Sequence, residues 1–216
     1  EAYDMVYNGF AFSEKIGEPI LLRMVTRLAH SRSGVEQKAQ QVQNEISFSE
    51  DPRQFILLPG NARKRYKVLL ERQAEFIEAS ESSPYNKYID GPNKKMGIIA
   101  CGIGYNYLME NYPDGCEYPV LKIGQYPLPK TQLLQLVEAC DEILVSEDGQ
   151  PFVEKQLKGY LGIGVKVKGR LDGTLPQDGE LNPDKVARTV GKENKSEFGV
   201  PSLVEMRPPA LCEGCG

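Results

Sequence analysis

The chain has 216 residues, of which 40% are hydrophobic and 26% are charged, and its formal net charge is -4 at pH 7. This length fits one and a half average domains or two small ones, and the composition is that of a globular protein. The negative net charge argues against nucleic-acid binding. The densest basic cluster, at residues 61–67, is interpreted as the solvent-exposed face of a predicted helix. There is no apolar run of the roughly 20 residues that a membrane helix needs, and no signal-peptide pattern, so we expect a cytoplasmic protein.

The first part of the sequence predicts two helices and one strand. Apolar residues recur at helical spacing over residues 2–16, which predicts a helix. The run PILLRMVTRLA, at residues 19–29, predicts a buried strand. A polar surface segment follows, and residues 62–80 then carry the apolar stripe of an amphipathic helix. Serine, proline, asparagine and glycine crowd residues 80–95, which predicts a linker with a domain boundary near Asn93.

Beyond this boundary, short apolar runs alternate with helical patterns. The predicted strands are 96–102, 118–124, 142–149 and 165–170, and the predicted helices are 105–112, 130–141, 151–162 and 182–191. Such alternation implies right-handed crossovers and a mainly parallel sheet with helices on both faces. Residues 93–191 are therefore predicted to form a three-layer α/β/α domain, and residues 192–216 lack periodicity and are predicted to be a connector.

Loops that follow parallel strands are the usual ligand-binding edge of such a domain. Gly102 and Gly104 follow the first strand, but the third glycine and the later acidic residue of a dinucleotide fingerprint are missing. A tight strand-to-helix turn is therefore favoured over a phosphate cradle. Glu147 and Asp148 follow the third strand and could serve in acid–base chemistry. A helix N-cap formed by Asp148, or a subunit contact, is the favoured interpretation.

His30 is the only histidine of the sequence, so no Ser-His or Cys-His pair can form without it. It lies with Arg27 and Ser31 just past the predicted strand at 19–29, where anionic substrates or diphosphates are often held. These three residues are candidates for positions near a substrate, with an ordinary loop histidine as the favoured alternative. Cys101 and Cys140 lie in apolar runs and are predicted core residues.

Cys212 and Cys215 have C-x-x-C spacing between glycines, so both thiolates can turn toward one metal centre. They supply half of a site, because structural zinc and a 4Fe–4S cluster each take four ligands. The other ligands would come from residues beyond this sequence or from another subunit. A thioredoxin-like motif is disfavoured, because no strand is predicted directly before the first cysteine.

Five stretches of the sequence share their content, order and spacing with one enzyme family. They are EPILLRMVTRLAHSRS, KMGIIACGIGYNYLMEN, YPVLKIGQYPLPKTQLLQLVEACDEILVSEDGQPFVEKQLKG, GRLDGTLPQDGELNPDKVA and RPPALCEGCG. With them, the sequence resembles an internal fragment of the α subunit of indolepyruvate:ferredoxin oxidoreductases. The resemblance implies that residues 1–92 are the C-terminal part of a thiamine pyrimidine-binding domain. It also implies that residues 93–191 are a transketolase C-terminal-like domain, and that residues 192–216 are a connector with the first residues of a diphosphate-binding domain.

The resemblance implies an enzyme that oxidatively decarboxylates aryl 2-oxoacids to acyl-coenzyme A, with ferredoxin as electron acceptor. Its cofactors would be thiamine diphosphate, Mg²⁺ and a 4Fe–4S cluster, and its partners a β subunit, ferredoxin, the 2-oxoacid and coenzyme A, in an oligomer. The family's catalytic glutamate and magnesium motif are not found in this sequence. We therefore expect the fragment alone to be inactive and to bind none of these cofactors, with Cys212 and Cys215 as cluster ligands of the intact enzyme. The alternative is a non-enzymatic α/β interaction module whose cysteine pair completes a zinc site with a partner.

Overall fold

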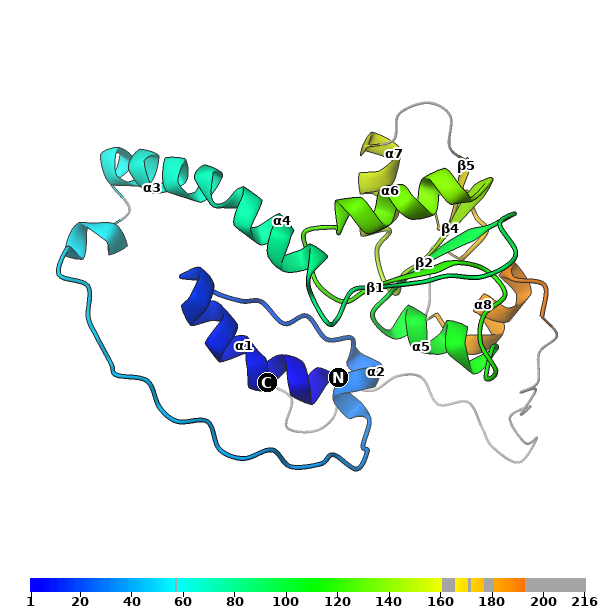
Figure 1. The fold of residues 1–216 in the computed structure, drawn as a ribbon, viewed down its shortest axis with the longest axis horizontal. Coiled ribbons are helices and arrows are strands. Elements are labelled where there is room, and N and C mark those ends of the chain that lie inside the picture. Colours follow the sequence, from blue (N-terminus) through cyan, green and yellow to red (C-terminus); the bar gives the residue numbers. More distant parts are fainter. Residues whose placement is uncertain (57, 161–165, 171, 177–180, 193–216) are drawn as a thin grey trace, which may run out of the picture.

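The computed structural model describes residues 1–56, 58–160, 166–170, 172–176 and 181–192 (Figure 1). The helices are α1 (Ala2–Ile16), α2 (Thr26–His30), η1 (Pro52–Phe55), α3 (Pro59–Glu71), α4 (Gln73–Glu81), α5 (Ile103–Glu110), α6 (Lys130–Ala139), α7 (Phe152–Tyr160) and α8 (Pro183–Thr189). The strands are β1 (Lys87–Ile89), β2 (Gly97–Cys101), β3 (Val120–Ile123), β4 (Glu142–Ser146) and β5 (Lys166–Lys168). Every strand and helix predicted beyond Asn93 is confirmed, with bounds that differ by a few residues.

The five strands form one sheet in the order β1-β3-β2-β4-β5. β2, β3, β4 and β5 run parallel, and β1 pairs antiparallel with β3 at one edge. In the register of the central strands, Ile99 of β2 lies between Leu121 of β3 and Val145 of β4. The mainly parallel sheet predicted from the alternating pattern is therefore confirmed.

Helices cover both faces of this sheet, so the three layers are confirmed as well (Figure 1). On one face, Ile98 and Ala100 of β2 pack with residues of α5 and α8. On the other face, Ile99 and Cys101 pack with residues of α6 and α7. All five residues of β2 are buried, because a central parallel strand is covered from both sides.

The N-terminal residues differ from the prediction at one element. α1 is confirmed, and Gly17 ends it in the left-handed conformation, at φ 65°. The strand predicted at residues 19–29 is wrong: none of these described residues is in the sheet, and α2 occupies their C-terminal part. An apolar run becomes a strand only where a neighbouring strand accepts its hydrogen bonds. Leu21 has no such neighbour, and its side chain is 91% exposed.

The helix predicted at 62–80 is confirmed as two helices, α3 and α4, that follow one another and project away from the sheet (Figure 1). We call residues 59–81 the arm. The break lies at Arg72, whose guanidinium donates hydrogen bonds to the Ile16 carbonyl (3.3 Å) and to the Glu18 carboxylate (3.1 Å). The segment at 80–95, predicted as a linker, contributes the edge strand β1. The domain limits at 92 and 191 stay a prediction.

Candidate functional site

β2 and β4 are neighbours in the sheet, and the helices that follow them, α5 and α7, cover opposite faces. In a doubly wound sheet this is the topological switch point, and ligands bind in the crevice beyond the carboxyl ends of its strands. We call the residues that follow these carboxyl ends the switch-point edge; they comprise 102–104, 124–129 and 147–151.

The Glu147 carboxylate lies at the start of α7, where an anionic ligand would otherwise bind. Its carboxylate accepts hydrogen bonds from the backbone N–H groups of Phe152 (3.0 Å), Val153 (2.9 Å) and Glu154 (3.1 Å). These are the free donors at the start of α7, where a bound phosphate or carboxylate would otherwise be held. The N-cap predicted here exists, but Glu147 provides it and Asp148 does not.

Burial changes the pKa values of Glu147 and of the neighbouring Cys101 thiol in the same direction. Burial raises the pKa of Glu147 above its ordinary value, although the three N–H donors favour the ionised form. On β2, burial raises the pKa of the Cys101 thiol well above its usual range, and the charge of Glu147 adds to this effect. Cys101 is therefore a buried thiol rather than a nucleophile, and its predicted place in the core is confirmed.

Asp148 and Arg170 link the carboxyl ends of β4 and β5. The buried Arg170 side chain donates from Nε to the Glu147 carbonyl at 3.0 Å, and its terminal nitrogen lies 3.6 Å from the Asp148 carboxylate. The same carboxylate accepts a hydrogen bond from the backbone N–H of Leu181 at 3.3 Å. Sequence reasoning missed Arg170, although an arginine at the end of a predicted strand was a usable signal. Both carboxylates of the Glu147–Asp148 pair thus hold the fold together.

The glycines after β2 form the tight turn that was predicted. Gly102 precedes α5 with a φ of 52°, a conformation that glycine adopts without a steric cost. A Cβ atom on Gly104 would lie 2.7 Å from the carbonyl oxygen of Ser146, at the end of β4. The first turn of α5 therefore packs directly on β4, and its glycine serves close packing.

A second side chain fills the edge beside β3. The buried Asn86 accepts hydrogen bonds at Oδ1 from the backbone N–H groups of Gly124 and Gln125, each at 2.9 Å. Its Nδ2 donates to the Ser80 hydroxyl (2.9 Å) and to the carbonyl of Gln125 (2.9 Å). The amide links the end of α4 to the loop after β3, and it occupies the first two backbone donors of this loop. Sequence reasoning missed Asn86, because in the sequence it is one of several polar residues in a predicted linker.

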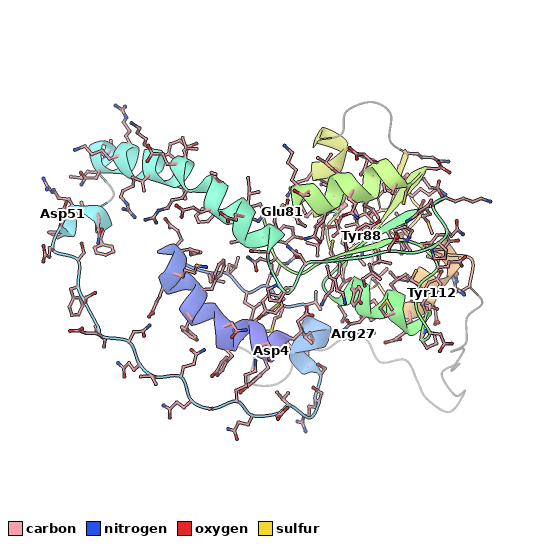
Figure 2. The ribbon with its side chains drawn as sticks, viewed as in Figure 1. Asp4, Arg27, Asp51, Glu81, Tyr88 and Tyr112 are labelled. Carbon is pink, nitrogen blue, oxygen red and sulfur yellow. The ribbon has the colours of Figure 1, made fainter. Side chains whose placement is uncertain are left out.

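The three residues predicted to lie near a substrate, Arg27, His30 and Ser31, are on α2 or directly follow it. The Arg27 guanidinium lies over the Tyr107 ring of α5, 5.6 Å from its centroid, and Figure 2 shows Arg27 between α2 and α5. His30 and Ser31 are exposed, and the Ser31 hydroxyl donates to the Leu28 carbonyl at 2.8 Å. The structure thus brings Arg27 against the α/β domain. A role for these three residues near a substrate stays a prediction.

The residues that the structure describes do not form a metal centre. Within them, no three His, Cys, Asp or Glu side chains gather in a way that could hold a metal ion. Cys212 and Cys215, the predicted metal ligands, lie outside the described residues. None of the helices described is both long and apolar enough to cross a membrane.

Comparisons with known proteins relate the whole chain to one kind of enzyme subunit. It is 32% identical over 227 residues to the indolepyruvate oxidoreductase subunit IorA of Methanothermobacter thermautotrophicus, covering 100% of this chain and 37% of that protein. The same subunit of Archaeoglobus fulgidus is 33% identical over 232 residues, and that of Pyrococcus abyssi 31% over 240 residues, with the same coverage. No family model matches the chain.

The doubly wound sheet defines the class of the chain as α/β, and the proteins that it matches over its whole length are named as oxidoreductase subunits. Within this class, the chain belongs to the family of the indolepyruvate oxidoreductase subunit IorA. It spans 37% of the length of the curated relatives it matches. The matched names give no support to the alternative of a non-enzymatic module that completes a zinc site.

Proposed function

We propose that the chain is the scaffold part of a 2-oxoacid oxidoreductase of the indolepyruvate type. Its α/β domain, a transketolase C-terminal-like domain in this proposal, holds neighbouring parts of the enzyme in place and binds no ligand at its switch-point edge. The observation that carries the proposal is that Glu147 occupies the backbone donors at the start of α7 and Asn86 occupies those of Gly124 and Gln125 after β3. An edge whose donors are taken by buried side chains cannot bind a diphosphate without losing those contacts.

The complete enzyme would convert an aryl 2-oxoacid and coenzyme A to acyl-coenzyme A and carbon dioxide, and would pass the electrons to ferredoxin with the help of a β subunit. Thiamine diphosphate, Mg²⁺ and a 4Fe–4S cluster would supply carbanion stabilisation and electron transfer. The described residues do not fit these groups well, because Glu147 and Asn86 already occupy the backbone donors at the start of α7 and at Gly124 and Gln125, and because no three described side chains form a cluster of metal ligands. Other residues of the enzyme would hold them, with Cys212 and Cys215 as two cluster ligands.

An activity assay tests the enzyme class. The subunit that contains this sequence is produced with its β subunit, and coenzyme A-dependent reduction of ferredoxin is measured with indolepyruvate and, as a control, with pyruvate. We expect reduction with indolepyruvate and at least about tenfold lower kcat/KM with pyruvate, a difference of about 1.4 kcal/mol in transition-state binding. An enzyme that reduces ferredoxin with neither 2-oxoacid would contradict the proposal.

The Glu147→Gln variant of the same enzyme tests the scaffold role. Because the Glu147 carboxylate accepts hydrogen bonds from three backbone groups of its own domain, we expect kcat to stay within about twofold while the melting temperature falls. A loss of more than about 100-fold in kcat with an unchanged melting temperature would place Glu147 in the reaction and refute the scaffold role.

Two further variants test the sequence-based site residues. His30→Ala should change the KM or kcat for the 2-oxoacid if His30 lies near the substrate, and wild-type kinetics would remove it from the site. Cys212→Ser should lower the iron content of the purified enzyme, because a cluster loses one of its four thiolate ligands. Unchanged iron with normal turnover would exclude Cys212 as a ligand.

A further inference from the structure

The N-terminal helices α1 and α2 lie beside the end of the sheet at which its parallel strands finish (Figure 1). From there, side chains of the N-terminal segment contact two loops of the switch-point edge. The methyl carbon of Met5 lies 3.2 Å from the position that a Cβ atom on Gly124, after β3, would take. A terminal nitrogen of Arg23 lies 3.3 Å from the equivalent position at Gly149, after β4. Because neither glycine has a side chain, both loops leave room for residues of the N-terminal segment.

Two further contacts lie close to this edge. The Arg27 guanidinium of α2 lies over the ring of Tyr107, a buried residue of α5, at 5.6 Å from the ring centroid. The Lys122 ammonium group, near the end of β3, forms an ion pair with the Glu1 carboxylate. Residues 1–27 therefore contact β3, the loops after β3 and β4, and the helix that follows β2.

The helices α1 and α2 depend on such contacts, because they have no core of their own. No residue of either helix is buried. α2 has only five residues and α1 has 15, whereas isolated helices shorter than about 12–15 residues are marginal in water. Residues 38–41 form hydrogen bonds with α1, but they are exposed themselves and cannot fix α1 on the α/β domain.

Arg23 and Arg27 make the contacts of the segment that leads into and includes α2. Arg23 is exposed and forms no ion pair within the residues that the structure describes. Burial raises the pKa of Tyr126, in the loop after β3, and the nearby charge of Arg23 acts in the opposite direction. The Tyr126 ring packs edge-on against Phe152, with 5.5 Å between the centroids. Arginine next to aromatic side chains is a typical composition for the residues that dominate an interface.

We propose that the switch-point edge, where other doubly wound sheets bind small ligands, is in this protein the docking surface for residues 1–30 of the same chain. Arg23 and Arg27 hold this segment on the edge. The inference rests on the proposed scaffold role and names the part that the α/β domain holds. It also gives the α/β domain a role in placing α2, which ends at His30, one of the three residues predicted to lie near a substrate.

Amide hydrogen exchange of the 216-residue chain, followed by peptide mass spectrometry, tests the proposal. In Arg23→Ala/Arg27→Ala, residues 2–30 should exchange at least about fivefold faster than in wild type, while β2 and β4 keep their rates. Tyr107→Leu keeps an apolar side chain but removes the ring under Arg27, so it should speed exchange of α2 from the domain side. The control Arg32→Ala/Arg63→Ala removes the same charge at two exposed positions and should exchange as wild type.

Two results would overturn the proposal. The first is equal exchange of residues 2–30 in wild type and Arg23→Ala/Arg27→Ala, which would mean that these arginines do not hold the segment. The second is faster exchange of β2 and β4 together with residues 2–30, which would mean a general loss of stability rather than undocking. The exchange rates are independent of activity. A failed docking test therefore leaves the enzyme class to the ferredoxin assay, and a failed ferredoxin assay leaves the exchange rates unchanged.

Discussion

Removing the Glu147 carboxylate should destabilise the α/β domain strongly. Glu147→Ala leaves three backbone N–H groups without an acceptor, two of which belong to the buried residues Val153 and Glu154. A hydrogen bond to a charged group contributes about 1.5–3 kcal/mol and a lost N-cap costs about 0.5–2 kcal/mol, partly offset by relief of the buried charge. We expect a net loss of about 3 kcal/mol, or roughly 6–12 °C in melting temperature for a chain of this size.

The assay is urea unfolding followed by circular dichroism, with Glu147→Gln as the conservative variant and Glu138→Gln, on an exposed position of α6, as the control. Glu147→Gln keeps an oxygen acceptor and should cost about 1.5 kcal/mol, whereas the control should stay within about 0.5 kcal/mol. If Glu147→Ala unfolds at the wild-type urea concentration, the cap does not stabilise α7 and the reasoning fails.

The pH dependence of the same variant tests the effect of burial. Because the folded-state pKa of Glu147 is raised above 4.5, the native state binds its proton more tightly than the unfolded chain. The resulting stability is fully present below pH 4.5 and is lost as the pH rises through the folded pKa. Since Gln cannot titrate, the stability advantage of wild type over Glu147→Gln should be largest below pH 4.5 and should decrease as the pH rises through the folded-state pKa of Glu147. A stability difference that increases with pH would mean that the N–H donors lower the pKa of Glu147 by more than burial raises it.

Three other predictions concern the packing of the domain. Asn86→Ala should cost about 1–3 kcal/mol in urea unfolding, because it leaves two part-buried backbone N–H groups of the loop after β3 without an acceptor; a cost under about 0.5 kcal/mol would contradict the network. Gly104→Ala should cost about 1–3 kcal/mol, because its Cβ meets a backbone carbonyl at 2.7 Å. Gly159→Ala, in open space on α7, should be neutral or stabilising by up to about 1 kcal/mol, and equal effects of the two glycine variants would refute the contact. Cys101, with its raised pKa, should react with iodoacetamide only as fast as the domain opens, so peptide mass spectrometry showing its rapid labelling in folded protein would contradict its burial.

The sequence was sufficient to predict the elements that depend on local pattern. The helix at residues 2–16 needs only its apolar period and the glycine that ends it, and the parallel sheet follows from short apolar runs separated by helices of crossover length. The run at residues 19–29 has the same apolar content as a strand. Whether it becomes one depends on a neighbouring strand, which is a property of the fold and not of the run.

The sequence predicted that a carboxylate caps the helix after β4, but it did not predict which residue forms the cap. Two carboxylates at the end of a predicted strand indicated a cap on the next helix, yet spacing alone could not choose between Glu147 and Asp148. The longer Glu147 side chain reaches back to the first N–H groups of α7, and Asp148 turns toward Arg170. Asn86 and Arg170 depend on long-range contacts, with segments about 40 and 20 residues away in the sequence. No periodicity in the sequence encodes such contacts.

The central claim is that the described part of this chain is a scaffold whose ligand edge is filled by its own side chains. A thermal melt of the 216-residue chain, with and without thiamine diphosphate and Mg²⁺, tests it most directly. A ligand at about 100 times its dissociation constant stabilises the native state by about 2.7 kcal/mol, or roughly 5–10 °C for a chain of this size. We predict no shift in melting temperature. A reproducible shift of that size would mean that the chain holds a cofactor site of its own, and would contradict the scaffold account.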